Sequence, residues 1–274
     1  MTTFSDKYES LVRRIMLHGE EVEVGQWQSQ DVSDKPHMIS RELRHETFKL
    51  PVARSLTGLQ HDIQPNLPWA EDHFLERVSG EPLNPPPSEA YWPYRVNGNA
   101  AHKEGERFSH TYPERMWPKF APDHPRIGGI TSSTMPGIRF VYGDLNDVVN
   151  QLTHNPLTRQ AYLPIWFPED TGAVQGQRVP CTLGYHFLCR GNRIEIVYYI
   201  RSCDLLRHFT DDVYMACRLL QWVVGKLQGN GIDARASQLI MHISSLHVFR
   251  GDYPRLEQMI LNYEEEPINY GTGI

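Results

Sequence analysis

A cysteine and an arginine in neighbouring predicted strands could form a nucleophilic site. Cys181 follows Val179 and Pro180 at the head of one apolar run, and Arg201 lies at the end of the next run. A cysteine reacts as its thiolate, so a cation beside the sulfur would lower its pKa and raise its reactivity near pH 7. We therefore predict that Cys181 is a nucleophile and that Arg201 activates it or binds a phosphate group.

The alternative for Cys181 is a buried structural thiol, which is the usual role of a free cysteine on an apolar strand. The other three cysteines, Cys189, Cys203 and Cys217, are predicted to be structural. The four form no CxxC pair, and four in 274 residues are too few for a disulfide framework. We expect reduced thiols and no metal, because the 13 histidines form no HExxH motif or paired Cys/His spacing.

A β-hairpin would position these two residues. Two runs, TLGYHFLC (182–189) and RIEIVYYI (193–200), flank the turn residues Arg190, Gly191 and Asn192. The second run alternates apolar and polar positions, as a strand with one buried face does. The sequence therefore predicts an antiparallel pair.

Periodic spacing predicts the remaining elements. Helices are expected at 8–19, 144–152, 211–228 and 253–263, and strands at 161–167 and 239–249. Residues 65–125 are rich in proline, aromatic and charged residues, so regular structure there should be short and interrupted. These signals run on without a clear linker. We therefore predict an α+β fold in a single catalytic domain, residues 1–274.

Composition restricts the class of protein. The chain is 40% hydrophobic and 22% charged, which is typical of a globular protein. A net charge of -6 argues against a broad basic surface for nucleic acid. No apolar stretch is long enough to span a membrane, and the N-terminus lacks the apolar run of a signal peptide. We expect a cytoplasmic protein that binds neither nucleic acid nor membrane.

The order of four motifs resembles the thymidylate synthase and deoxycytidylate (dCMP) hydroxymethylase superfamily. Residues 179–181 (VPC) are followed by 201–204 (RSCD), by Asp212 and by 245–248 (SLHV). The order is more specific than any single motif. The resemblance implies a mixed sheet with flanking helices and a dimer packed through sheet faces.

Upstream residues extend the resemblance. Residues 145–152 (LNDVVNQL) and 155–159 (NPLTR) are similar to the helix and arginine turn that precede the family's catalytic strand. Tyr112, followed five residues later by Trp117, resembles the hydroxymethylase branch. The resemblance covers residues 144–263 well and residues 8–120 only in patches.

The resemblance also implies how phosphate is bound. It assigns Arg159 to the phosphate in the partner subunit's site, which implies an obligate homodimer. The family usually has a second arginine next to this one, where this chain has Gln160. Relatives carry a cation in an N-terminal phosphate loop, whereas residues 21–26 contain none. Three arginines could substitute for it: Arg41, Arg44 and Arg54.

The reaction that the resemblance implies begins with addition of the Cys181 thiolate to carbon 6 of a pyrimidine nucleotide. This addition makes carbon 5 nucleophilic toward the one-carbon unit of the co-substrate 5,10-methylenetetrahydrofolate. In the synthase branch a hydride from folate then gives a methyl group, and in the hydroxymethylase branch water gives a hydroxymethyl group. A carboxylate must handle water and protons at that step. The resemblance assigns this role to Glu71, or to Glu76 or His73 if the alignment shifts.

Aromatic residues are expected around the reacting carbon. The resemblance gives Tyr112 a part in removing the carbon 5 proton through a water network. It places Trp92 and Trp117 on the folate side of the pocket. The alternative for all three is ordinary packing in the core.

Asp212 is expected to select the base and to take part in catalysis. The synthase branch has an asparagine at this position that pairs with uracil, whereas an aspartate accepts from the exocyclic amine of cytosine. The alternative is a favourable charge at a helix N-terminus, which would explain both Asp211 and Asp212.

The resemblance also implies the contacts around the sugar. It assigns Ser202 and Asp204 to the substrate site, with Asp204 also near folate, and His247 to the 3'-hydroxyl. Phe249 replaces the tyrosine that relatives have two residues after that histidine, which keeps a ribonucleotide possible.

We therefore predict an enzyme that transfers a one-carbon unit from methylenetetrahydrofolate to dCMP and hydrates it to 5-hydroxymethyl-dCMP. Three alternatives stay open. They are a CMP hydroxymethylase of nucleoside natural-product biosynthesis, a thymidylate synthase that methylates dUMP, and a non-catalytic relative that binds nucleotides.

Overall fold

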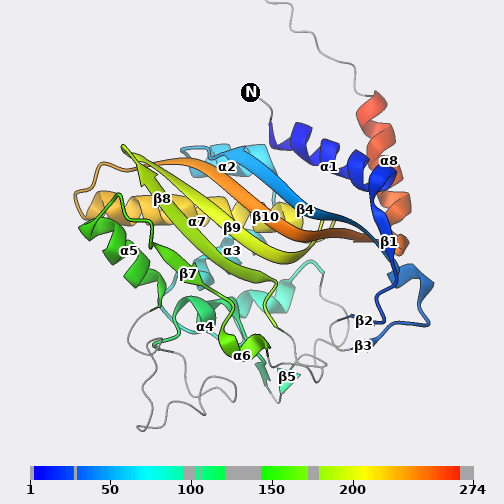
Figure 1. Cartoon of the computed structure of the whole chain (residues 1–274), viewed down its shortest axis with the longest axis horizontal. Helices are drawn as coiled ribbons and strands as arrows, with labels where there is room; N and C mark the ends of the chain where they lie inside the picture. The colour runs from blue at the N-terminus through cyan, green and yellow to red at the C-terminus, as the bar shows by residue number, and fades with distance from the viewer. Residues whose placement is uncertain are drawn as a thin grey trace, which may run out of the picture.

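A six-stranded mixed sheet organises the chain in the computed structural model, which describes residues 3–27, 30–94, 103–104, 106–120, 143–171 and 179–265 (Figure 1). The strands lie in the order β1-β4-β10-β9-β8-β7. Strands β9 and β10 are parallel, and the other neighbours are antiparallel. Their bounds are Glu20–Val22 (β1), Ser40–Pro51 (β4), Tyr162–Pro164 (β7), Thr182–Arg190 (β8), Arg193–Asp204 (β9) and Arg235–Phe249 (β10). The predicted α+β class, a mixed sheet with flanking helices, is confirmed.

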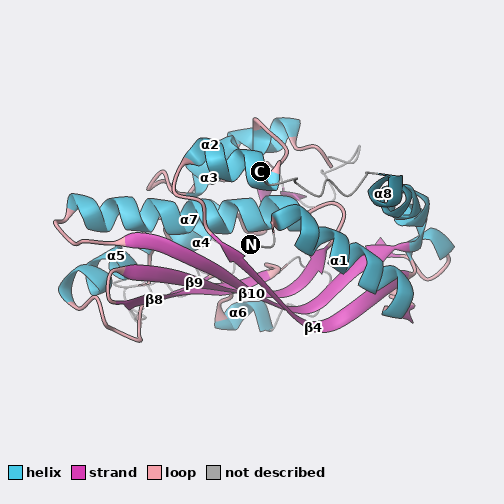
Figure 2. Ribbon diagram, turned by 90° about the horizontal axis from the view of Figure 1, so that it is seen from above, coloured by secondary structure: helices cyan, strands magenta, loops and turns pink. Residues whose placement is uncertain are grey.

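Helices flank this sheet in layers. Figure 2 shows α7 running along one side of the sheet, with α2 and α3 on the far side of α7. The helices are α1 (Phe4–His18), α2 (Leu56–Ile63), α3 (Trp69–Arg77), α4 (Tyr112–Met116), α5 (Leu145–His154), α6 (Pro168–Thr171), α7 (Phe209–Gly229) and α8 (Tyr253–Glu265). None of these described helices is long and apolar enough to cross a membrane.

Short elements connect these layers. They are the 3-10 turns η1 (Pro36–Met38), η2 (Pro87–Tyr91) and η6 (Arg250–Asp252), and two small ribbons. One ribbon pairs β2 (Gln26–Trp27) with β3 (Gln30–Asp31), and the other pairs β5 (Lys103–Glu104) with β6 (Arg107–Phe108). The short, interrupted structure predicted for residues 65–125 is confirmed where that stretch is described.

The predicted hairpin is confirmed as β8 and β9. Arg190 pairs with Arg193, so Gly191 and Asn192 form a two-residue turn. Gly191 has a φ of 61°, a left-handed conformation that glycine adopts without a steric penalty. Strand β8 begins at Thr182, so Cys181 lies immediately before the strand.

Period-two alternation divides the sheet into two faces. One row of paired residues, Leu163, Tyr185, Tyr198, Met241 and Phe48, crosses five strands and is buried. The next row consists of Tyr162, His186, Val197, Ile240 and Lys49, and these residues are exposed or partly exposed. The core therefore lies on the side of the sheet that α7 covers.

The predicted helices and strands occur, with shifted bounds. The strand expected at 161–167 is only three residues long, because the chain enters α6 soon afterwards. The strand expected at 239–249 begins earlier, at Arg235. Strand β4 was not predicted. It reads SRELRHETFKLP, and only Ser40, Leu43, Phe48 and Leu50 are buried, so it has neither an apolar run nor strict alternation.

Candidate active site

Cys181 and Arg201 are brought together as predicted. The Arg201 backbone N–H donates to the Cys181 carbonyl oxygen at 2.9 Å, which joins the head of β8 to the end of β9. The Arg201 guanidinium donates to the carbonyl oxygens of Pro180 at 3.0 Å and Val179 at 3.2 Å. Its Nη2 lies 3.9 Å from Cys181 Sγ. A fixed positive charge at this distance would stabilise a thiolate.

The other cysteines have a different environment. Cys189, Cys203 and Cys217 are buried, whereas Cys181 is partly exposed. Burial raises the pKa of each of these three thiols. They are therefore held as neutral thiols, which agrees with the structural role predicted for them.

Tyr112 lies one hydrogen bond from the residue that follows Cys181. The Thr182 hydroxyl donates to Tyr112 Oη at 3.1 Å and lies 2.9 Å from Tyr198 Oη. Burial raises the pKa of Tyr112, so its hydroxyl remains protonated and able to donate or accept. Thr182 was not predicted as a site residue. Its hydroxyl connects the start of β8 to α4.

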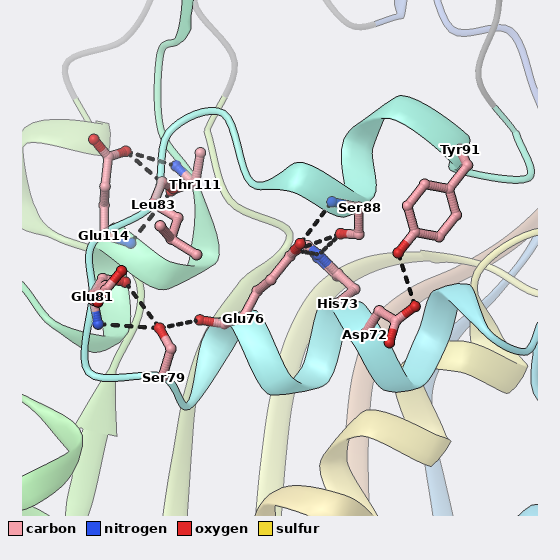
Figure 3. A network of polar contacts seen from close by, with 10 residues as sticks. All are labelled: Asp72, His73, Glu76, Ser79, Glu81, Leu83, Ser88, Tyr91, Thr111 and Glu114. Carbon is pink, nitrogen blue, oxygen red and sulfur yellow. Dashed lines mark hydrogen bonds and ion pairs between the residues drawn. The ribbon is translucent and has the colours of Figure 1, made fainter.

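A buried polar network fixes α4 and the segment before it. Glu114 accepts from the Thr111 backbone N–H at 3.0 Å and from Asn84 Nδ2 at 2.8 Å. Arg107 also donates to the Glu114 carboxylate, at 2.7 Å. Figure 3 shows Glu114 beside Thr111 at the start of α4. These contacts determine the direction of α4, and with it the position of Tyr112.

Glu76 and His73 on α3 form hydrogen bonds in the same network of polar contacts (Figure 3). The Ser88 backbone N–H donates to Glu76 Oε1 at 2.6 Å, and Ser88 Oγ donates to Glu76 Oε2. His73 Nδ1 lies 2.9 Å from Ser88 Oγ. Burial lowers the pKa of His73 to about 4, so the imidazole is neutral at pH 7. These two side chains hold η2 against α3, and neither has a described contact with Cys181 or Tyr112.

Glu71 faces α7. It accepts from Arg218 Nη2 at 2.8 Å and Nε at 2.9 Å, and from the Tyr214 hydroxyl at 2.6 Å. Burial acts to raise the pKa of Glu71, but the hydrogen bonds from Arg218 and Tyr214 outweigh it and leave the pKa below its usual value. Glu71 is thus an ionised partner of α7. Its predicted role with water stays a prediction, and no described contact joins it to Cys181.

Asp212 lies in the first turn of α7, and its carboxylate has one hydrogen-bond partner among the described residues. Cys203 Sγ donates to its Oδ2 at 3.7 Å. The neighbouring Asp211 is occupied, because it accepts from the Asn66 backbone N–H and side-chain amide at 2.9 and 2.8 Å. Burial raises the pKa of Asp212 to about 7, and Arg77 opposes this increase. Asp212 can therefore present either a carboxylate or a carboxylic acid near neutral pH.

This shifted pKa gives a prediction for stability. An aspartate whose pKa is about 7 when folded and 3.8 when unfolded makes the folded protein less stable as pH rises from about 4 to 7. Asp212→Asn removes that titration. The free energy of unfolding of the variant minus that of the natural protein should therefore be larger at pH 8 than at pH 5. One pKa unit corresponds to about 1.4 kcal/mol, so we expect a difference on the order of 1 kcal/mol or more. Urea denaturation at both pH values measures it.

The control for this prediction is Asp34→Asn, which changes an exposed aspartate. Its effect on the free energy of unfolding should be the same at pH 5 and pH 8. An equal effect of Asp212→Asn at the two pH values would contradict the prediction.

The end of the sheet brings together three of the predicted substrate-site residues. His247 on β10 pairs with Asp204 on β9 and with Glu42 on β4, and Ser202 lies two positions before Asp204. Asp204 accepts from the backbone N–H groups of Leu206 and Arg207, both at 3.0 Å. Asp204 therefore also shapes the turn before α7.

The predicted phosphate arginines lie in different places. Arg159 is exposed after α5, and its carbonyl oxygen lies 3.0 Å from Nε2 of His186, on the less buried face of the sheet. Arg41 donates to the Met16 carbonyl oxygen at 2.6 Å and to Glu21 at 3.3 Å. Arg44 pairs with Glu20 at 2.9 Å. Arg54 is exposed. None of these has a described contact with Cys181.

The sequence of this chain matches that of a known protein family. A sequence model described as thymidylate synthase matches residues 109–269, more than half of the 274 residues. The chain belongs to the thymidylate synthase family. The matched range contains Tyr112, Cys181, Arg201, Asp212 and His247.

Two curated relatives are similar to this thymidylate synthase family member over part of its length. "Putative thymidylate synthase" from Methanococcoides burtonii is 27% identical over 113 residues, which cover 41% of this chain and 49% of the relative. "Thymidylate synthase" from Fusobacterium nucleatum is 24% identical over 123 residues, which cover 45% of this chain and 42% of the relative. The chain thus spans less than half the length of these curated relatives.

The two tryptophans predicted beside folate have different environments in this thymidylate synthase family member. Trp117 is buried, and its indole N–H donates to the Arg77 carbonyl oxygen at 2.8 Å. Trp92 is partly exposed and stacks on His208, with ring centroids 5.6 Å apart. Trp92 therefore presents an aromatic surface next to the start of α7, whereas Trp117 is a core residue.

Arg77 is, besides Thr182, a site residue of this thymidylate synthase family member that was not predicted from the sequence. Arg77, at the end of α3, is 5% exposed, and its guanidinium carbon lies 4.1 Å from the centre of the Tyr112 ring. The signal was its spacing: Trp69, His73 and Arg77 are four residues apart, so they share one helix face. A cation on the buried face of a helix indicates an unusual environment.

Proposed function

We propose that this chain transfers a one-carbon unit from 5,10-methylenetetrahydrofolate to carbon 5 of dCMP and produces 5-hydroxymethyl-dCMP. The observation that carries this proposal is Arg201 Nη2 3.9 Å from Cys181 Sγ, in a site that also contains Tyr112. Cys181 is the one cysteine of the chain that is not buried. A thiol with a fixed cation beside it suits nucleophilic addition to an electron-poor ring.

In this proposal, the residues of the chain have separate roles. The Cys181 sulfur forms a bond to carbon 6, and Arg201 stabilises the thiolate beforehand. The Tyr112 hydroxyl, held by Thr182, takes part in moving the proton from carbon 5. The folate supplies the one-carbon unit.

Asp212 supports cytosine as the base. It is poised near neutral pH and lacks a strong partner of its own in the described chain. As a carboxylate it accepts from the exocyclic amine of cytosine. His247 and Ser202 would contact the sugar, and Asp204 would hold the turn between them and Asp212.

The residues near the start of α7 fit a flat, aromatic co-substrate. Trp92 and His208 stack at an interplanar angle of 12°, and Trp69 lies tilted beside Trp92 at 6.4 Å. The indole N–H of Trp69 is buried without a hydrogen-bond partner in the part of the chain that the structure describes. A pterin ring stacks on aromatic faces and offers acceptors to such a donor. Trp92 is the side chain that we propose as the folate contact.

A second candidate function is methylation of dUMP. It is favoured by the names of both curated relatives, each of which is called a thymidylate synthase. An aspartate at position 212 argues against it, because its ionised form, which accepts from the amine of cytosine, offers no donor to oxygen 4 of uracil.

Product masses distinguish the candidates. Purified protein would receive methylenetetrahydrofolate with dCMP, CMP or dUMP in parallel reactions. A hydroxymethyl group on dCMP supports the proposal, and the same group on CMP would transfer it to ribonucleotides. A methyl group on dUMP would establish the second candidate. Nucleotide binding without any product would indicate a non-catalytic relative.

We also propose that the active form is a homodimer packed through the less buried face of the sheet. Tyr162 is 41% exposed on this face, and Tyr199 stacks on His242 with centroids 5.4 Å apart. Arg159 lies beside the same face, through its carbonyl contact with His186. A second copy placed on this face could therefore receive Arg159 in its own site.

Mixed dimers test the crossing of Arg159. Cys181→Ser and Arg159→Ala should each be inactive alone, but a heterodimer of the two should contain one intact site. Random assembly gives half heterodimers, so an equal mixture should recover about a quarter of the natural activity. The control pairs Cys181→Ser with Arg201→Ala. Both residues act in one chain's own site, so this mixture should recover none. Equal recovery in the two mixtures would contradict the crossing.

A further inference from the structure

Arg77 is a buried cation without a carboxylate partner among the described residues. It is 5% exposed, its Nε has no hydrogen-bond partner, and it forms no ion pair in the described parts of the chain. Arg115, which is also buried, is paired in two places with Asp170, and Arg218 is paired with Glu71. Burial of an unpaired guanidinium is strongly unfavourable, so a fold that keeps one has a use for its charge.

The position of Arg77 points to the reacting ring. Its guanidinium carbon lies 4.1 Å from the centre of the Tyr112 ring, and Tyr112 is joined through Thr182 to the residue after Cys181. The positive charge of Arg77 acts to lower the pKa of both Tyr112 and Asp212. Arg77 therefore lies close to Tyr112, which is hydrogen-bonded to the residue after Cys181, and to Asp212, the proposed contact to the base.

The chemistry of the proposed reaction creates a need for a cation there. When the sulfur lone pair forms the bond to carbon 6, the carbon 5–carbon 6 π electrons move to the bond between carbons 4 and 5. The π electrons at carbon 4 then move to a heteroatom, which is nitrogen 3 in cytosine and oxygen 4 in uracil. Asp212 as a carboxylate would repel the negative charge that develops on that atom. A buried donor with positive charge would stabilise it.

We propose that Arg77 is a further catalytic residue of this site, and that its guanidinium donates a hydrogen bond to the ring heteroatom that receives this electron pair. Asp212 accepts from the adjacent group, the 4-amino group of cytosine. Arg77 and Asp212 together form a donor and an acceptor that match nitrogen 3 and the amine of cytosine. This inference rests on the proposed function, because it requires attack at carbon 6 of a pyrimidine.

Glu71 lies on the same helix as Arg77 but has different partners. Its carboxylate accepts from Arg218 and Tyr214 on α7. The side chain of α3 that contacts the Tyr112 ring is a cation. In this proposal α3 contributes the hydrogen-bond donor to the pyrimidine ring, and α7 contributes the carboxylate of Asp212.

The test measures tritium release from carbon 5 of the nucleotide that the natural protein turns over, with methylenetetrahydrofolate present. Arg77→Gln should fold, with a thermal midpoint close to that of the natural protein, and keep KM within about threefold. Its kcat should fall about 100-fold, as for loss of a donor to a developing anion. The acid limb of its pH profile should move upward, because the charge that lowers the pKa of Asp212 is gone.

Each other outcome is decisive. A folded Arg77→Gln with kcat within about threefold of the natural protein and an unchanged acid limb would overturn the inference. If Arg77→Gln does not fold, Arg77→Lys decides, because lysine keeps the charge but cannot place a donor in the same position. A lower kcat with unchanged KM then supports the inference, and the natural kcat overturns it. If the natural protein itself releases no tritium from any nucleotide, the proposed function fails and this inference fails with it.

Discussion

Cys181→Ser is expected to abolish turnover. The serine hydroxyl is a far weaker nucleophile near pH 7, and the Arg201 cation that favours a thiolate cannot ionise an alcohol to a useful extent. We expect kcat to fall by at least about 1,000-fold, as for removal of other covalent nucleophiles. Nucleotide binding should persist, because Arg201, Asp212 and His247 remain. Steady-state assays and calorimetric titration with the nucleotide measure the two effects.

Cys189→Ala is the matched control. Cys189 is buried on β8 and its thiol donates to the Gly191 carbonyl oxygen, so the change affects the hairpin without touching the site. It should leave kcat within about threefold. Iodoacetamide should alkylate Cys181 alone in the native protein, and mass spectrometry would locate the label. Labelling of a different cysteine, or an active Cys181→Ser, would remove Cys181 from the mechanism.

Asp170→Ala is expected to cost the fold about 3 to 5 kcal/mol, because it leaves the Arg115 guanidinium buried without its carboxylate. Arg115 Nη1 and Nη2 donate to Asp170 at 2.7 and 2.9 Å, and both side chains are almost completely buried. The guanidinium also lies over Phe167, with its carbon 4.5 Å from the ring centre. The pair therefore fixes α4 to α6. Urea denaturation measures the loss in free energy of unfolding.

Two further variants separate this effect from a general sensitivity to lost charge. Glu9→Gln breaks the partly exposed ion pair with Arg13 on α1 and should change the free energy of unfolding by less than about 0.5 kcal/mol. Arg115→Met combined with Asp170→Ala removes both charges and should recover much of the stability that Asp170→Ala loses. A loss below about 1 kcal/mol in Asp170→Ala would show that the buried pair contributes little.

The unequal success of the sequence reasoning has a physical basis. The hairpin around Gly191 depends on a two-residue turn and period-two alternation, and helix α7 depends on a periodic apolar stripe. All of these are local features of the sequence. Such signals are present in any stretch that forms the element. Strand β4 lacks them, because charged side chains occupy much of it and its longer partner, β10, is distant in sequence.

The candidate site divides in the same way. The sequence by itself determined the order of the motifs around Cys181, Arg201 and Asp212, because each depends on residue type and spacing along the chain. Only the tertiary structure decided that Glu71 faces Arg218. Only the tertiary structure brought the buried guanidinium of Arg77 over Tyr112. The direction of a side chain on α3 depends on what packs against the helix, and here those partners come from α4 and α7, far along the chain.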